Sequence, residues 1–332
     1  MGERGPARLV PLGPGGEFDF IRRVLAHGPA LGPHVLIGPG DDAAVLVGGW
    51  VLSTDLSVED VHFRRSWITD REIGFRAAAA ALSDLAAMAA EPLGILVSMA
   101  FPPGGGVDAE AVQGGIREAG ALVGAPVLGG DVSRSPGPLF LDVTVVGRTA
   151  SPVSRSGAQP GDEVWVTGRL GASAAAVRIW RSGGEPAPGL RSAFARPTPR
   201  IEAARTLARA GVLRALVDLS DGLAGDAGHL AAAGGVRVVL ESARIPLGEG
   251  VADVLGDEEA LDAALRGGED YELCFAAPPG AVDPATLGTA AGVGLTRVGR
   301  VEAGAGVLLE APDGSVVPLA GGGYDHLEGG RA

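Results

Sequence analysis

Five short segments of this chain end in carboxylates that stand beside Gly, Ser or Thr, and the chain contains no lysine. The segments are G-D-D-A-A at 40–44, S-T-D at 53–55, S-D at 83–84, G-G-D at 129–131 and D-L-S-D-G at 218–222. Two unpaired carboxylates about 4 Å apart repel by roughly 4 kcal/mol at an effective dielectric near 20, so a fold that gathers them needs a bound cation. Hard oxygen ligands favour magnesium or calcium. We therefore predict a site for several magnesium ions, which implies a phosphorylated substrate.

Composition limits the classes of protein to which the chain can belong. With 332 residues, 46% of them hydrophobic and 20% charged, it suits a soluble protein of about two domains. The net charge of −13 argues against a nucleic-acid partner. A single cysteine, Cys274, suits the reducing cytoplasm. We find no secretion signal, and the apolar runs at 77–90 and 93–101 are too short or too interrupted to span a membrane.

The pattern of apolar residues predicts an α/β (α+β) fold with helices and strands in both halves. The expected strands are 49–55, 93–101, 125–131, 139–145, 163–167, 215–220, 236–240 and 271–275. The expected helices are 70–90, 107–123, one that starts near Gly171, 197–210 and 222–233. Thr69 and Glu72 form a capping-box pattern before the first helix, and Pro92 and Gly94 are expected to end it. A Ser-, Pro- and Gly-rich connection at 150–160 divides the chain into domains 1–150 and 151–332.

Asp84 is the strongest single indication of a functional site. Between Arg76 and Glu91 the predicted helix holds only Ala, Leu and Met apart from Ser83 and Asp84. A carboxylate on such an apolar helix is costly unless it is paired or bound to a metal. The alternatives are a solvated stripe of the helix or an ion pair with Arg76.

The other acidic segments are less specific when each is taken alone. Alternation along a strand sends Ser53 and Asp55 to one face, although a strand end can also simply cap a turn. Asp42 follows a Gly-Pro-Gly turn, and the glycines before Asp131 allow close backbone approach to a phosphate. Amides of 218–222 suit a phosphate at a helix N-terminus, unless Ser220 or Asp221 only caps that helix.

Three further residues and one segment are candidates with ordinary alternatives. His62 lies in a loop-like segment, Arg155 is placed to clamp phosphate, and Tyr324 is suited to stack on a flat ring; each also fits a structural role. The segment G-G-E-D-Y-E-L at 267–273 puts acids directly before an apolar strand. His27, His34 and His229 have no evident partners, and we interpret them as structural.

Eight motifs occur in the order of a known family: GDDAAVL, STDLSVEDVHF, ALSDLAAMAAEPLG, LGGDVSR, SRSGAQPGD, DLSDGL, GGEDYEL and GYDH. Together they closely resemble the bacterial thiamine-monophosphate kinases of the aminoimidazole-ribonucleotide-synthetase-like superfamily. The resemblance runs from about Gly16 to His326, and VEDVHF and GGEDYEL favour this family over its relatives. The connection before SRSG, at 149–153, departs from the family pattern, and the first fifteen residues match nothing.

The resemblance implies transfer of a phosphoryl group from ATP to thiamine monophosphate, which gives thiamine diphosphate in the last step of that coenzyme's synthesis. It implies a cytoplasmic homodimer of two-domain subunits, whose N-terminal mixed sheets join in a barrel-like layer, each with a C-terminal α/β domain that completes the site. By motif, the implied magnesium ligands are Asp42, Ser53, Thr54, Asp55, Asp84, Asp131, Asp218 and Asp221. The implied ATP contacts are Gly130, Asp131, Arg155 and Ser220, and the implied thiamine contacts are His62, Glu269 and Tyr324.

Phosphoryl transfer depends mostly on positioning and on electrostatic stabilisation, and the acceptor is already an anion, so no strong general base is needed. We expect direct in-line transfer without a covalent intermediate, with His62 positioning the substrate. The rival hypotheses are another ATP-using enzyme of the superfamily and a non-catalytic magnesium–nucleotide binder. Selenophosphate synthesis is disfavoured because no reactive Cys or Lys lies near the N-terminus. A structural calcium site is disfavoured because no 12-residue loop ends in a bidentate Glu.

Overall fold

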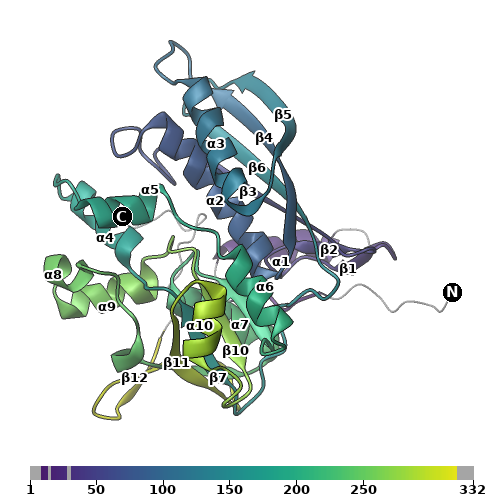
Figure 1. The fold of residues 1–332 in the computed structure, drawn as a ribbon, viewed down its shortest axis with the longest axis vertical. Helices are drawn as coiled ribbons and strands as arrows, with labels where there is room; N and C mark the ends of the chain where they lie inside the picture. Colours follow the sequence, from purple (N-terminus) through teal and green to yellow (C-terminus); the bar gives the residue numbers. More distant parts are fainter. Residues whose placement is uncertain (1–8, 14–15, 28–30, 320–332) are drawn as a thin grey trace.

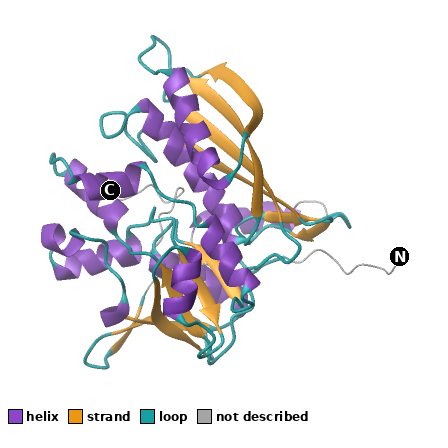
Figure 2. Cartoon of the chain, viewed as in Figure 1, coloured by secondary structure: helices purple, strands orange, loops and turns teal. Residues whose placement is uncertain are grey.

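The computed structural model describes residues 9–13, 16–27 and 31–319, which form two β-sheets with helices packed beside them (Figures 1 and 2). In chain order the elements are α1 (Gly16–His27), β1 (Val35–Ile37), β2 (Ala44–Leu46), β3 (Trp50–Val58), α2 (Asp70–Ala87), β4 (Glu91–Phe101), α3 (Ala109–Val123), β5 (Val127–Arg134), β6 (Phe140–Arg148), β7 (Glu163–Thr167), α4 (Ala172–Arg181), α5 (Pro188–Ala195), α6 (Ile201–Arg209), β8 (Ala215–Asp218), α7 (Leu223–Gly234), β9 (Arg237–Glu241), the 3₁₀ turn η1 (Ser242–Arg244), α8 (Val251–Leu255), α9 (Asp257–Arg266), β10 (Leu273–Ala277), α10 (Pro284–Ala291), β11 (Leu295–Glu302), β12 (Gly306–Glu310) and β13 (Val316–Pro318). The mixed α/β class predicted from the sequence is confirmed. Among the described residues, no helix combines the length and the apolarity that crossing a bilayer requires.

The first sheet has the strand order β1-β2-β3-β6-β4-β5. Strand β5 runs parallel to β4, while the other neighbours are antiparallel, so the sheet is mixed as expected. Helices α2 and α3 pack against each other on one side of this sheet (Figure 1). All the strands come from residues 35–148, before the Ser-, Pro- and Gly-rich connection.

Helix α2 begins with the predicted capping box. The Thr69 amide donates to Glu72 Oε2 at 2.9 Å, and the Glu72 amide donates to Thr69 Oγ1 at 3.3 Å. The helix ends at Ala87, earlier than expected, so Pro92 and Gly94 do not end it. Both lie within β4, where Pro92 is near the start of the strand and costs little pairing.

The face of the first sheet that α2 and α3 leave uncovered carries apolar side chains. Leu56, Leu96 and Leu128 are between 40% and 58% exposed. In the strand register Leu56 pairs with Asp142, Asp142 with Ser98, and Ser98 with Asp131. Residues paired across a sheet share one face, so Asp131 and Asp142 lie on this open face with the leucines.

The second sheet, of order β13-β12-β9-β11-β7-β10-β8, is drawn from residues 163–318. Its edge strand β8 and the neighbouring β10 are buried at every residue, and Leu273 pairs with Asp218. Strand β10 begins two residues later than predicted because Tyr271 adopts a φ of +51°, far from the negative φ that a non-glycine residue has in a strand. Helix α6 likewise starts at Ile201, after Pro197 and Pro199, and not at Pro197 as expected.

Helix α2 lies between the two sheets. It contacts β3 and β6 of the first sheet and β8 of the second, as well as α5 and α6. A helix that is buried on all sides is apolar all round, which explains its alanine run. The same position brings Asp84, the one acidic residue in that run, to the junction of the two halves.

Candidate active site

Three of the predicted acidic residues converge at the junction of the two halves. Carboxylate oxygens of Asp42, Asp84 and Asp218 all lie within 4.8 Å of one another. Asp42 stands in the turn between β1 and β2, Asp84 on α2, and Asp218 at the end of β8. The acidic segments at 40–44, 83–84 and 218–222 therefore form one group, as the sequence predicted.

Strand β3 adds Ser53 and Asp55 on the side of the sheet that faces α2. The hydroxyl of Ser53 donates to Asp84 Oδ2 at 2.5 Å and lies 3.2 Å from the carbonyl oxygen of Asp42. Asp55 lines the adjacent cavity. Burial raises the pKa of Asp55, and the charge of Arg76 opposes that shift. The alternation that predicted one face for Ser53 and Asp55 is confirmed.

Asp84 and Asp218 have shifted pKa values because their charges are crowded and shielded from water. Burial, with the charges of Asp218 and Asp55, raises the pKa of Asp84 well above its usual range. Burial and the charge of Asp42 raise the pKa of Asp218 to about 7. Converging carboxylates of this kind form a donor set of hard oxygens, which fits a divalent cation such as magnesium.

Arg155 brings one positive charge to this group. Its Nε and Nη2 donate to the two carboxylate oxygens of Asp42 at 2.9 and 2.8 Å, and its amide donates to Asp41 Oδ1 at 3.1 Å. Ser154 Oγ donates to Asp41 Oδ2 at 2.5 Å. The connection at 150–160 is therefore fixed against the turn at 40–42, and the Arg155 guanidinium faces a proposed metal ligand.

A second group lies beside the first, and sequence reasoning found only one of its members. Ligand atoms of Asp221, Asp226 and His229 lie within 4.8 Å of one another, and the Asp221 amide donates to Asp226 Oδ2 at 3.1 Å. Burial, together with Arg155, lowers the pKa of His229 to about 4, so the imidazole is neutral. The spacing of Asp226 and His229, three residues apart on α7, was the signal available in the sequence.

The N-terminus of α7 also corrects an alternative reading of the segment at 218–222. Gly222 is the N-cap, and it has no side-chain capping bond, so neither Ser220 nor Asp221 caps the helix. Ser220 and Asp221 line the cavity instead.

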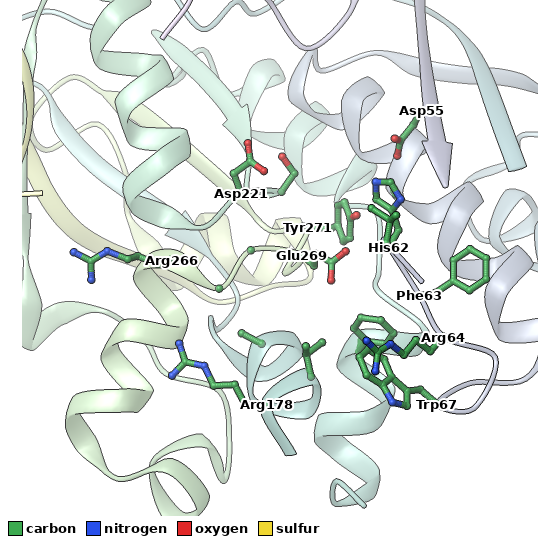
Figure 3. A pocket seen from close by; sticks show the side chains of 18 of the residues that line it. Asp55, His62, Phe63, Arg64, Trp67, Arg178, Asp221, Arg266, Glu269 and Tyr271 are labelled. Carbon is green, nitrogen blue, oxygen red and sulfur yellow. The ribbon is translucent and has the colours of Figure 1, made fainter. Parts of the chain in front are cut away.

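The cavity has a volume of about 850 Å³ and opens beside the acidic group. Figure 3 shows Asp55, His62, Glu269 and Tyr271 gathered around one part of it. The Val58 amide donates to His62 Nδ1 at 3.0 Å. Because a backbone amide can only donate, Nδ1 carries no proton, and the neutral ring holds its proton on Nε2. His62 is therefore arranged as a hydrogen-bond donor in the cavity wall.

Glu269 lies in a strained segment that crosses the end of β8. Glu269 has a φ of +62° and Tyr271 one of +51°, both unfavourable for residues other than glycine. The Glu269 amide donates to the Ser220 carbonyl at 2.7 Å, and the Tyr271 amide donates to the Leu219 carbonyl at 2.9 Å. Between them, Asp270 accepts from the Gly171 amide at 2.8 Å and so supplies the cap that α4 lacks.

Three predicted residues are placed away from the acidic group. Thr54 points to the open face of the first sheet, where its hydroxyl donates to Asp142 Oδ1 at 2.6 Å. Gly130 and Asp131 lie on the edge strand β5, exposed, and do not line the cavity. Tyr324 lies outside the described residues.

Arg76 is a residue whose role the sequence did not reveal. The ion pair with Asp84, considered as an alternative, does not form; Arg76 pairs with Glu269. Its Nη1 also donates to the Phe194 carbonyl at 2.6 Å.

Aromatic and basic side chains form the remainder of the cavity wall. Trp67 stacks on Trp180 with ring centroids 5.2 Å apart, and Arg64 lies 4.9 Å above Trp67. Arg178 and Arg266 both pair with Asp262, at 2.6 and 2.7 Å, across the cavity from His62 (Figure 3). No sequence motif indicated these residues, because each lies alone on a helix or loop of ordinary composition.

Comparison with known proteins agrees with the resemblance seen in the sequence. Residues 40–149 match the family "AIR synthase related protein, N-terminal domain", and residues 159–310 match "AIR synthase related protein, C-terminal domain". Thiamine-monophosphate kinase of Methanopyrus kandleri is 37% identical over 296 residues, which are 88% of this chain and 92% of that protein. The Escherichia coli K12 enzyme of the same name is 34% identical, over 94% of this chain and 98% of its own length.

Solved structures give the same result. The structure described as AaThiL complexed with AMPPCP and TMP superposes with a TM-score of 0.77 at 30% identity, covering 92% of this chain and 95% of its own. Two family matches and relatives above 30% identity over nearly the whole chain establish its family. The chain belongs to the thiamine-monophosphate kinases, a family of AIR synthase related proteins.

Proposed function

We propose that this protein phosphorylates thiamine monophosphate with ATP and forms thiamine diphosphate, the last step of that coenzyme's synthesis. The family supports the reaction, since named relatives are thiamine-monophosphate kinases and one related structure holds AMPPCP and TMP. The observation that carries the proposal here is the convergence of Asp42, Asp84 and Asp218 beside a cavity that also presents His62 and Glu269.

We propose that this protein holds several magnesium ions. The residues suited to this role are those of the acidic group and its neighbours: Asp42, Ser53, Asp55, Asp84, Asp218 and Asp221. At these residues magnesium would supply the positive charge that offsets the charge of the phosphates. Thr54 and Asp131 were expected in the same set, but their side chains lie on the opposite face of the first sheet. We therefore assign the metal site to the other six residues.

The chain's own residues would then position the two phosphates. His62 offers a proton on Nε2, which suits a phosphate oxygen of the acceptor. The acceptor phosphate is itself the nucleophile, so we propose direct in-line transfer with no phosphorylated protein intermediate. We further propose that Glu269 and Tyr324 contact the thiamine rings.

For ATP we propose contacts from Gly130, Asp131, Arg155 and Ser220. Ser220 stands beside the acidic group, where a phosphate chain would meet the amides of 218–222. Arg155 donates two hydrogen bonds to Asp42, so it would bind phosphate either beside that carboxylate or after releasing it. Gly130 and Asp131 do not line this cavity, so we propose that they would contact ATP from the exposed edge strand β5.

We propose that the protein is a cytoplasmic homodimer. Its open sheet face carries Leu56, Leu96 and Leu128. An apolar face of this kind is typical of a surface that another protein covers. A second copy placed there would bury the face and bring Thr54 and Asp131 to the interface.

The test is formation of thiamine diphosphate from ATP and thiamine monophosphate in the presence of magnesium, with free thiamine as the negative control. The proposal expects product from the monophosphate and none from free thiamine. Binding of ATP without any acceptor-dependent ADP release would instead identify a non-catalytic nucleotide binder. Turnover with another acceptor of the superfamily, and none with thiamine monophosphate, would also refute the proposal.

A further inference from the structure

We propose that Arg76 is a positioning residue for the acceptor substrate, and that it acts by holding Glu269 in the cavity wall. The proposal rests on the kinase function proposed above. It adds a residue from the first half of the chain that fixes a substrate-contact residue in the second half.

Arg76 is held rigidly beneath the cavity. It is 3% exposed and lies on α2, with its guanidinium 3.9 Å from the ring centre of Phe194 and 5.9 Å from that of Tyr271. Nη1 donates to the Phe194 carbonyl at 2.6 Å. A guanidinium fixed by a ring and a carbonyl presents its remaining donors in one direction, toward Glu269.

Glu269 needs such a partner because its backbone is strained. A non-glycine residue at positive φ persists only when its surroundings fix it, and Glu269 has a φ of +62°. The hydrogen bond from its amide to the Ser220 carbonyl fixes the backbone, and the ion pair with Arg76 fixes the side chain. Through the same segment, Glu269 is tied to the end of β8, where Asp218 lies.

Arg76 also brings a positive charge to two carboxylates that would otherwise repel. The charges of both Arg76 and Glu269 act on Asp55, with opposite sign. Asp55 comes from β3 of the first sheet and Glu269 from the segment before β10 of the second. Without this positive charge, repulsion by Asp55 would turn Glu269 away from its place in the cavity wall.

A buried arginine can also act only by stabilising the junction of the two halves. A purely structural role would lower the melting temperature and the amount of active protein. It would not selectively change the Michaelis constant for one substrate, nor depend on the side chain of Glu269. These two readouts therefore separate the positioning role from the structural one.

The experiment is a double-mutant cycle of Arg76→Met and Glu269→Gln, with KM and kcat measured for both substrates and melting temperatures recorded. We expect Arg76→Met to raise KM for thiamine monophosphate by roughly tenfold or more and KM for ATP by less than about threefold. The double variant should be no worse than Arg76→Met alone, because the two residues act as a unit. Arg76→Lys, which keeps the charge, should recover part of the loss.

Arg71→Met is the matched control, since Arg71 lies on the same helix but pairs with Glu118 at the exposed surface. It should leave both Michaelis constants unchanged. Multiplying effects in the double variant, or equal rises in KM for both substrates, would overturn the proposal. If Arg76→Met does not fold, the cycle of Arg76→Lys with Glu269→Gln decides by the same criteria. An inactive wild-type protein would refute the kinase function itself, and this proposal with it.

Discussion

Arg155 donates two hydrogen bonds to the carboxylate of Asp42, at 2.9 and 2.8 Å, and so joins the connection at 150–160 to the first acidic segment. The Asp42 side chain is fully buried, and that of Arg155 is 15% exposed. A residue expected to contact ATP is thus paired with a residue expected to ligate magnesium. The two halves of the chain therefore share the charges of one site.

Replacing Arg155 tests this sharing. Arg155→Ala leaves Asp42 buried without its cation, which costs about 3 to 5 kcal/mol when one partner of a buried pair is removed. Magnesium should restore part of that stability, because a divalent ion can compensate the same carboxylate. Thermal unfolding with and without magnesium measures this. An equal loss of stability in both conditions would show that Arg155 does not share its carboxylate partner with the metal site.

Asp84→Asn should abolish most of the activity without destabilising the metal-free protein. The amide keeps the size of the side chain but removes a charge that burial and its neighbours oppose. We expect kcat to fall by about 100-fold or more, as for other groups that stabilise charge in the transition state. Asp313→Asn, at an exposed turn, is the control and should be neutral. Turnover of Asp84→Asn close to wild type would remove Asp84 from the site.

The raised pKa of Asp218 predicts a pH dependence of stability in metal-free protein. Its folded pKa is about 7 and its ordinary value is 3.8, so the folded state binds more protons between them. The stabilisation is therefore complete below about pH 4 and is lost as the pH rises toward and through 7. Urea unfolding in EDTA should show wild type losing stability relative to Asp218→Asn as the pH rises from about 5 to 8. A difference that does not change with pH would contradict this prediction.

The tautomer of His62 predicts which replacements are tolerated. His62→Phe removes the donor at Nε2 and should raise KM for thiamine monophosphate by about tenfold, since a charged substrate group loses a hydrogen bond. His62→Gln keeps a donor and should retain most of the affinity. Steady-state kinetics with each substrate varied will check this.

A phosphorylated protein that transfers its label in a chase would show that the transfer is not direct.

The placement of single acidic residues on their own helix or strand was readable from the sequence, because local patterns specify it. Alternation along β3 separates Ser53 and Asp55 from Thr54, and the apolar run of α2 marks Asp84. The capping box at Thr69 fixed the start of that helix. These features depend on neighbours in the chain, so a pattern of a few residues specifies them.

The remaining features depend on pairing between distant segments, which no local pattern encodes. The face on which Asp131 lies follows from its register with Ser98 in β4. The partner of Arg76 follows from the packing of α2 against the segment before β10. Tyr271 was predicted in a strand, yet contacts with Leu219 hold it at positive φ. Tertiary contacts decided each of these three outcomes.

The central claim is that the acidic group holds divalent ions for phosphoryl transfer. Manganese substitutes for magnesium at oxygen sites and can be counted by electron paramagnetic resonance. We predict that wild-type protein with a non-hydrolysable ATP analogue and thiamine monophosphate binds more than one manganese ion, and that Asp84→Asn binds fewer. The same number of bound ions in both proteins would contradict the claim.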